Sequence, residues 1–210
     1  IRMIMIFRPY EYQQTAIRWI LKNPRCGLFL DMGLGKTVST LTAVQQLMDD
    51  CEVSRTLVVA PKKVAETTWT TEAEKWEHLK ALRVVKVMGT EKQRKLALAS
   101  KADVYVIGRD SFVWLVGLYG GNLPFDVLVI DELTSFKSSK SNRFKAICSV
   151  FLSISRSGLN SIKSYAKTFF MLLIIYSFIC MASSSLIPSN SGAETPGAIS
   201  GSMISKSKLI

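Results

Sequence analysis

Gly-Leu-Phe-Leu-Asp-Met-Gly-Leu-Gly-Lys-Thr stands at residues 27–37, and this stretch decides the fold prediction. A short apolar run predicts a strand, a glycine-rich turn follows it, and a helical pattern begins at Lys36. In such a turn the backbone N–H groups and the helix N-terminus point toward an anion. The lysine then meets the β- and γ-phosphates of a nucleotide, and the Thr37 hydroxyl can hold Mg²⁺.

We therefore predict a nucleotide phosphate site in this turn. Its residues are Met32, Gly33, Leu34, Gly35, Lys36 and Thr37. The strict form of the pattern has a glycine six residues before the lysine, and Leu30 stands there instead. The alternative, a plain glycine turn between strand and helix, would leave Lys36 in a crowded turn with no anion beside it.

Composition limits the class of protein. The 210 residues suffice for one medium domain, or for one domain with an appendage, and 48% of them are hydrophobic. The net charge of +11 suits a polyanionic partner or an anionic membrane surface. The four cysteines have no C-x-x-C spacing, which argues against a metal cluster or a disulfide framework and favours a reducing, cytoplasmic location.

Helical and extended patterns alternate through the first 146 residues. Helices are expected over residues 11–21, 36–48, 64–76 and 91–99, and strands over 27–30, 56–60, 84–88, 104–107 and 127–130. Strands that are apolar throughout and separated by helices predict an α/β fold whose mostly parallel sheet is covered on both faces. Trp69 and Trp76 lie at helical spacing and are expected in the core rather than stacked on bases.

The character of the chain changes after Ala146. Residues 147–210 include 16 serines and a single acidic residue, Glu194, and the helix–strand alternation stops. An apolar segment over residues 169–182 is shorter than the roughly 20 residues that cross a bilayer. We expect this tail to be irregular or to contain one apolar helix.

Three interpretations of residues 147–210 are open. The apolar segment can be a membrane anchor, which the preceding basic residues would orient with the N-terminal part in the cytoplasm. It can also be a buried core helix. The interpretation that we favour is that the tail did not evolve with the first part, for example through a change of reading frame, because serine excess and loss of acidic residues begin at one point.

A second conspicuous motif is the acidic pair Asp131 and Glu132 at the end of the apolar run 127–130. In P-loop ATPases the acidic residue at such a strand end holds Mg²⁺, and we assign this role to Asp131. Glu132 is then the general base that polarises the attacking water, with Lys36 as the second catalytic residue. An ordinary helix start, where acidic residues favour the positive end of the dipole, is the alternative for this pair.

These motifs together resemble the Swi/Snf-type branch of the DEAD/DEAH-box helicase superfamily, in particular its compact phage and bacterial members. The resemblance rests on Arg-Pro-Tyr at 8–10 with Tyr-Gln at 12–13, Met-Gly-Leu-Gly-Lys-Thr at 32–37, Val-Ala-Pro-Lys at 59–62 and Asp-Glu-Leu-Thr at 131–134. It implies that residues 1–146 are a helicase-type ATP-binding lobe, a RecA-like P-loop three-layer sandwich. Residues 147–210 have no counterpart in it.

Further roles follow from the resemblance. Gln13 matches the glutamine that reads the adenine ring, although it can also be an ordinary polar residue of the first helix. Pro61, Lys62 and Lys63 match the segment that contacts the nucleic-acid backbone, and exposed lysines beyond a strand end can neutralise phosphates. Arg109 is a further candidate for this contact, with a surface ion pair to Asp110 as the alternative.

The resemblance implies ATP and Mg²⁺ as cofactors and nucleic acid, DNA rather than RNA, as partner. It also implies a second RecA-like lobe that carries an arginine finger, and this sequence contains no such lobe. We therefore expect the ATP-binding lobe of a DNA-dependent ATPase, truncated and impaired in this form. The alternatives are a membrane-anchored nucleotide-binding protein and a nucleic-acid-binding module without ATPase activity.

Overall fold

The computed structural model describes residues 4–132, 136, 138–159 and 170–176, and for residues 153–159 and 170–176 it describes the backbone alone. All of these residues fall within one unit of the chain, residues 1–178. The rest of the serine-rich tail lies outside the described residues.

The described strands form a single sheet in which every pairing is parallel. The strands are β1 (Arg25–Leu30), β2 (Thr56–Ala60), β3 (Val84–Val87), β4 (Val104–Gly108), β5 (Val127–Asp131) and β6 (Phe170–Tyr176). Their spatial order is β1-β6-β5-β2-β4-β3. Strands β2, β4 and β5 are buried along their whole length, as expected of central strands whose two faces are both covered.

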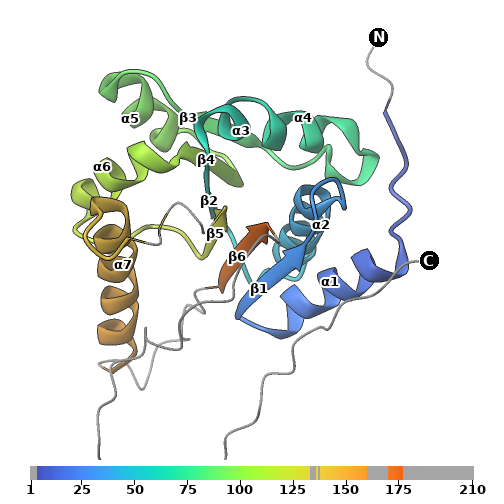
Figure 1. Cartoon of the computed structure of the whole chain (residues 1–210). Helices are drawn as coiled ribbons and strands as arrows, with labels where there is room; N and C mark the ends of the chain where they lie inside the picture. Colours follow the sequence, from blue (N-terminus) through green and yellow to red (C-terminus); the bar gives the residue numbers. More distant parts are fainter. Residues whose placement is uncertain (1–3, 133–135, 137, 160–169, 177–210) are drawn as a thin grey trace, which may run out of the picture. The chain divides into compact units, whose positions relative to one another are not determined.

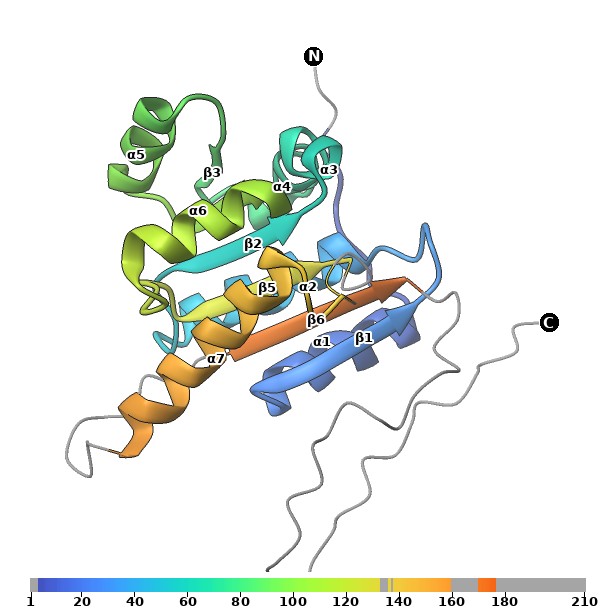
Figure 2. The same ribbon diagram turned by 60° about the vertical axis from the view of Figure 1, so that its left-hand side comes forward.

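Helices cover the sheet on both sides (Figures 1 and 2). They are α1 (Glu11–Lys22), α2 (Lys36–Asp49), α3 (Lys62–Glu66), α4 (Thr68–Lys75), the short 3₁₀ helix η1 (Glu77–Leu79), α5 (Glu91–Ala99), α6 (Arg109–Tyr119) and α7 (Asn142–Leu159). Buried residues of α1, α2, α3 and α4 form one core cluster with Val58 and Ala60 of β2. Buried residues of α5, α6 and α7 form the other with Leu57 and Val59 of the same strand. Because successive strand residues face opposite sides, this alternation defines the three layers and confirms the predicted α/β sandwich.

Helix α7 runs without a break through the point where the composition changes. Its residues Ala146, Ile147 and Val150 are buried in the core cluster shared with α5 and α6. The N–H of Phe144 donates to the Ser141 hydroxyl in the turn before the helix. Secondary structure therefore continues beyond residue 146, while the origin of residues 147–210 stays a prediction.

Residues 170–176 correct the expectation of an irregular tail or an apolar helix. They form β6, which pairs with β1 on one side and with β5 on the other (Figure 2). The expectation was wrong here because a short run that is apolar at every position suits a buried parallel strand as well as a helix. Periodicity cannot separate the two, and sheet pairing decides.

The remaining residues of the apolar segment, 169 and 177–182, lie outside the described residues. In the part of the chain that the structure describes, no helix combines the length and the apolar character that crossing a bilayer requires.

Candidate nucleotide-binding site

Apart from Gln13 in α1, the predicted site residues follow the carboxyl ends of four parallel strands. The glycine-rich turn follows β1, Pro61 follows β2, Arg109 follows β4, and the acidic pair stands at the end of β5. Parallel strands bring their carboxyl ends to one edge of a sheet, where α/β proteins bind their ligands. The structure therefore brings the predicted groups to the same edge.

The turn between β1 and α2 has the backbone that its glycines predict. Gly33 and Gly35 have φ angles of +82° and +72°, in the left-handed region that other residues avoid. A Cβ atom on Gly35 would also lie 2.5 Å from Nε2 of Gln13. The turn thus needs glycine at Gly35 for two independent reasons, its dihedral angle and the close approach of a side chain.

Gln13 contacts this turn directly. Its side-chain amide donates to the carbonyl of Leu34 at 3.3 Å, and its Oε1 accepts from the N–H of Tyr10 at 3.0 Å. The side chain is 6% exposed. Gln13 therefore connects the start of α1 to the glycine-rich turn, and its predicted contact with adenine stays a prediction.

Lys36 is buried at the first position of α2, with 6% of its surface exposed. Its Nζ donates to the carbonyls of Leu30 and Asp31, both at 2.7 Å. Burial lowers the pKa of Lys36, and the negative charges of Asp131 and Asp31 oppose that shift. The lysine is thus held across the base of the turn and within the electrostatic reach of the acid at the end of β5.

Asp131 is the matching buried acid, with 4% of its surface exposed. Its Oδ2 accepts a hydrogen bond from the indole N–H of Trp69 at 3.2 Å. Burial raises the pKa of the Asp131 carboxyl to about 6, and the Glu132 charge adds to the rise, while the Trp69 N–H and Lys36 oppose it. A buried carboxylate with a perturbed pKa beside a buried lysine is typical of a functional site.

Glu132 adopts a backbone conformation that is rare for its residue type. Its φ angle is +70°, which costs roughly 1–3 kcal/mol outside glycine. Its carboxylate lies 3.8 Å from Nη1 of Arg109, and both side chains are about one-third exposed. Arg109 therefore pairs with Glu132. Asp110, the partner in the alternative interpretation of Arg109, pairs instead with Arg143 at 2.9 Å.

The remaining predicted residues lie around these groups. Thr37 is partly accessible in the first turn of α2, and Leu34 is partly buried, whereas Met32 is 80% exposed. Pro61 precedes α3, whose first residues Lys62 and Lys63 are exposed, in line with a role in contacting phosphates. Whether these residues touch a nucleotide or a nucleic acid stays a prediction.

Sequence reasoning missed two contacts of the site. Trp69 was expected only in the core, and it is fully buried there, but its N–H also reaches Asp131. The pairing of Arg109 with Glu132 was likewise not expected. No local pattern signals either contact, because each joins residues that only the packing of the sheet and its helices brings together.

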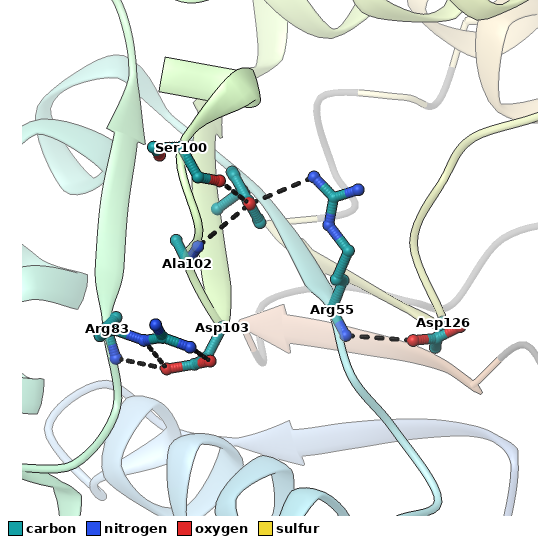
Figure 3. A network of polar contacts seen from close by, with 7 residues as sticks. Arg55, Arg83, Ser100, Ala102, Asp103 and Asp126 are labelled. Atoms are coloured by element: carbon teal, nitrogen blue, oxygen red, sulfur yellow. Dashed lines mark hydrogen bonds and ion pairs between the residues drawn. The ribbon is translucent and has the colours of Figure 1, made fainter. Parts of the chain in front are cut away.

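The opposite edge of the sheet holds a different polar network (Figure 3). Asp126 accepts from the N–H groups of Ser54 and Arg55, and Arg83 binds Asp103 through two side-chain hydrogen bonds. A cavity of about 530 Å³ lies beside Arg55, Arg83 and Asp103. These partners bind one another at the amino ends of the strands, whereas the predicted nucleotide-binding turn and acidic pair follow the carboxyl ends.

The carboxyl edge fits a magnesium nucleotide by the chemistry of its donors. It offers the N-terminus of α2, an ammonium group at Lys36, a hydroxyl at Thr37 and a buried carboxylate at Asp131. Among the described residues, no group of three or more His, Cys, Asp or Glu side chains forms a metal site. Mg²⁺ is commonly held by one or two protein ligands together with substrate phosphates and water.

Comparison with known proteins agrees with this geometry. Residues 12–159 match the model of the SNF2-related domain family. Over 134 residues the chain is 40% identical to protein p41 of Acyrthosiphon pisum secondary endosymbiont phage 1, covering 63% of this chain and 29% of that protein. Over 156 residues it is 30% identical to the ATP-dependent helicase FUN30 of Saccharomyces cerevisiae, covering 67% of this chain and 13% of that helicase.

A solved structure shows the same fold. The SWI2/SNF2 ATPase core of Sulfolobus solfataricus, solved in complex with dsDNA, superposes with a TM-score of 0.61 at 21% identity. The match covers 82% of this chain and 34% of the archaeal one. The chain spans less than a third of the length of the two curated relatives named above. Because the family model matches more than half of this chain, the chain belongs to the SNF2-related domain family.

Proposed function

We propose that this chain is the ATP-binding lobe of a DNA-dependent ATPase of the helicase-like translocase type. One observation carries the proposal. Lys36 and Asp131 are both buried, at 6% and 4% exposure, on the same edge of the sheet as the glycine-rich turn. Burying two charged side chains costs free energy unless they pair with a ligand or with each other. Membership of the family supports ATP as that ligand.

Each residue of the edge has a role in this proposal. The backbone of residues 32–35 and the Nζ of Lys36 bind the phosphates, and Gln13 supports the turn and faces the base. Thr37 and Asp131 hold Mg²⁺. When bound, the ion neutralises charge on the triphosphate and orients it. Glu132 accepts a proton from the attacking water.

The nucleic-acid contact is proposed for the same edge. Lys62 and Lys63 are exposed at the start of α3, and Arg109 begins α6 beside Glu132. Cationic side chains in these positions can neutralise backbone phosphates without reading sequence. The net charge of +11 favours a polyanion, and the archaeal SWI2/SNF2 core solved with dsDNA supports DNA.

Nucleotide binding is tested by calorimetry with Mg-ATP on the 210-residue chain. Lys36→Ala is expected to weaken ATP binding at least about 30-fold, because removing one partner of a buried charge pair costs roughly 2–5 kcal/mol. Lys92→Ala, on the exposed face of α5, removes the same charge far from the turn and is the control. If the unaltered chain produced no binding heat, or if both variants bound equally well, the proposal would be wrong.

Turnover is the second measurement. We propose that the 210-residue chain alone hydrolyses ATP slowly, because a second lobe supplies an arginine worth roughly 10³–10⁵ in rate in related phosphoryl-transfer systems. Rapid DNA-stimulated ATP hydrolysis by this chain would contradict the proposal that its ATPase activity is impaired, but it would not contradict the proposed nucleotide site. DNA affinity that is indifferent to Lys36→Ala, with no ATP binding, would instead indicate a nucleic-acid-binding module.

A further inference from the structure

The contact between Trp69 and Asp131 joins two distant parts of the chain. Trp69 lies in the first turn of α4, and Asp131 ends β5, 62 residues later. The indole Nε1 lies 3.2 Å from Oδ2 of the carboxylate, and the side chains are 0% and 4% exposed. At such burial a carboxylate needs a hydrogen-bond donor, and a fixed donor also determines how the group is oriented.

The donor is itself held rigidly. Trp69 belongs to the core cluster that includes Leu41 of α2, Ala65 of α3 and Leu79 of η1. Side chains in a close-packed core stay in single rotamers, so the indole cannot turn away from the acid without disturbing several elements. The position of the N–H is therefore set by packing rather than by the acid.

A second tryptophan nearby offers a contrast. Trp76 follows the last turn of α4 and also donates its indole N–H to a carboxylate, that of Glu72, at 2.8 Å. That contact spans only four residues and lies at a partly buried surface position. Trp76 thus makes a local bond, whereas Trp69 reaches from a helix to the acid at the end of a central strand.

We propose that Trp69 is a positioning residue of the nucleotide site, whose indole N–H orients the Asp131 carboxylate so that it can help to hold Mg²⁺. This inference rests on the proposed function and extends it to a residue outside the glycine-rich turn and the acidic pair. Residues that orient a metal ligand by hydrogen bonding typically change metal affinity about 10–100-fold when they are altered.

The test separates the hydrogen bond from the packing. Benzothienylalanine has the shape of tryptophan but carries sulfur in place of the N–H, so its incorporation at Trp69 removes the donor and keeps the volume. We expect the affinity for Mn²⁺ in the presence of ATP, measured by electron paramagnetic resonance, to fall about 10-fold or more. The affinity for ATP in the presence of EDTA should remain within about two-fold of that of the unaltered chain.

The same replacement at Trp76 is the matched control and should leave both affinities unchanged. A second variant, Trp69→Phe, should lose Mn²⁺ affinity to a similar extent, with some loss of thermal stability from the smaller ring. Circular dichroism establishes that each variant is folded at the temperature of the measurement.

The outcomes are distinct. If the Trp69 replacement leaves Mn²⁺ affinity unchanged while the unaltered chain binds Mn²⁺ and ATP, the positioning role is wrong and the proposed function stands. If both affinities fall together, Trp69 serves packing alone and the inference is overturned. If the unaltered chain binds neither ATP nor Mn²⁺, the proposed function fails and the positioning role with it.

Discussion

The polar groups at the two edges of the sheet differ in their surroundings. At the amino edge, the hydroxyl of Tyr105 accepts from Arg55 and from the N–H of Ala102 and donates to the carbonyl of Ser100, and Arg83 binds Asp103 (Figure 3). These are complementary partners, and the network joins the starts of β2, β3 and β4.

At the carboxyl edge, two charged side chains, Lys36 and Asp131, are buried, with 6% and 4% of their surface exposed. The Lys36 ammonium is bound by two backbone carbonyls, the Asp131 carboxylate by an indole, and Glu132 has a left-handed backbone. Burial lowers the pKa of Lys36 and raises the pKa of Asp131, and both shifts favour the neutral form of the side chain. The amino edge therefore pairs its polar groups with one another, whereas the carboxyl edge combines buried charge with an unfavourable backbone conformation, as expected if it is the proposed nucleotide site.

The largest expected difference concerns Asp131. Its pKa is raised by burial to about 6 in the folded protein, above the ordinary 3.8, so at pH 7 folding buries a charge that the unfolded chain solvates. Asp131→Asn should therefore stabilise the ligand-free protein at pH 7 by roughly 2–3 kcal/mol, at about 1.4 kcal/mol per pKa unit. Binding of Mg²⁺ should be lost.

The stability difference between Asp131→Asn and the unaltered protein should depend on pH. As the pH falls from 7 to 4, the folded protein takes up this proton before the unfolded chain does, so the unaltered protein gains stability from this group. The advantage of Asp131→Asn over it should shrink toward zero. Urea denaturation of both proteins across this pH range measures the difference, and a difference that does not vary with pH would contradict the comparison.

The next effect is expected at the other edge. Tyr105 is 1% exposed, and its hydroxyl makes hydrogen bonds with three partners. Tyr105→Phe removes this hydroxyl. Leaving buried groups without a partner costs roughly 1–3 kcal/mol, so the midpoint of urea denaturation should fall while ATP affinity stays within about two-fold. Tyr119→Phe, at a partly buried position of α6, is the control. A loss of ATP affinity in Tyr105→Phe would show that the edges are not independent.

The smallest effect on stability is expected for Arg109. Its ion pair with Glu132 is about one-third exposed, so Arg109→Gln should change stability by about 1 kcal/mol or less. If the proposed nucleic-acid contact is right, DNA affinity should fall and its salt dependence should weaken by about one counterion. The measurement is fluorescence anisotropy with a DNA duplex over a range of salt.

Lys101→Gln removes one charge from the amino edge and is the matched control for this prediction. Equal losses of DNA affinity in the two variants would mean that the net charge, and not the position of Arg109, attracts the nucleic acid.

Secondary structure was predicted best where patterns are local and complete. Helix α2 was expected over residues 36–48 and covers Lys36–Asp49, and strand β2 has the expected bounds. The helix expected over residues 64–76 is instead divided at Thr67 into α3 and α4. Its helical periodicity continues across the division, so the pattern alone could not reveal it.

Helices α6 and α7 and strand β6 were not predicted. Helix α6 follows β4 without any intervening residue, and α7 lies across the point where the composition changes. The run at residues 170–176 is apolar at every position, which does not distinguish a helix from a strand. Strand pairing on both sides decides that it is a strand.

The sequence by itself determined the glycine-rich turn, the lysine and threonine at the start of α2 and the acidic pair, because each depends on neighbouring residues and on short-range backbone geometry. Only the tertiary structure decided which side chains meet there. Gln13 contacts the turn, Trp69 binds Asp131 and Arg109 pairs with Glu132, across separations of 21 residues for the first contact and 62 for the second. The physical reason is that such contacts arise from strand order and helix packing. Hydrophobic periodicity predicts the fold class, but it does not determine which side chains meet.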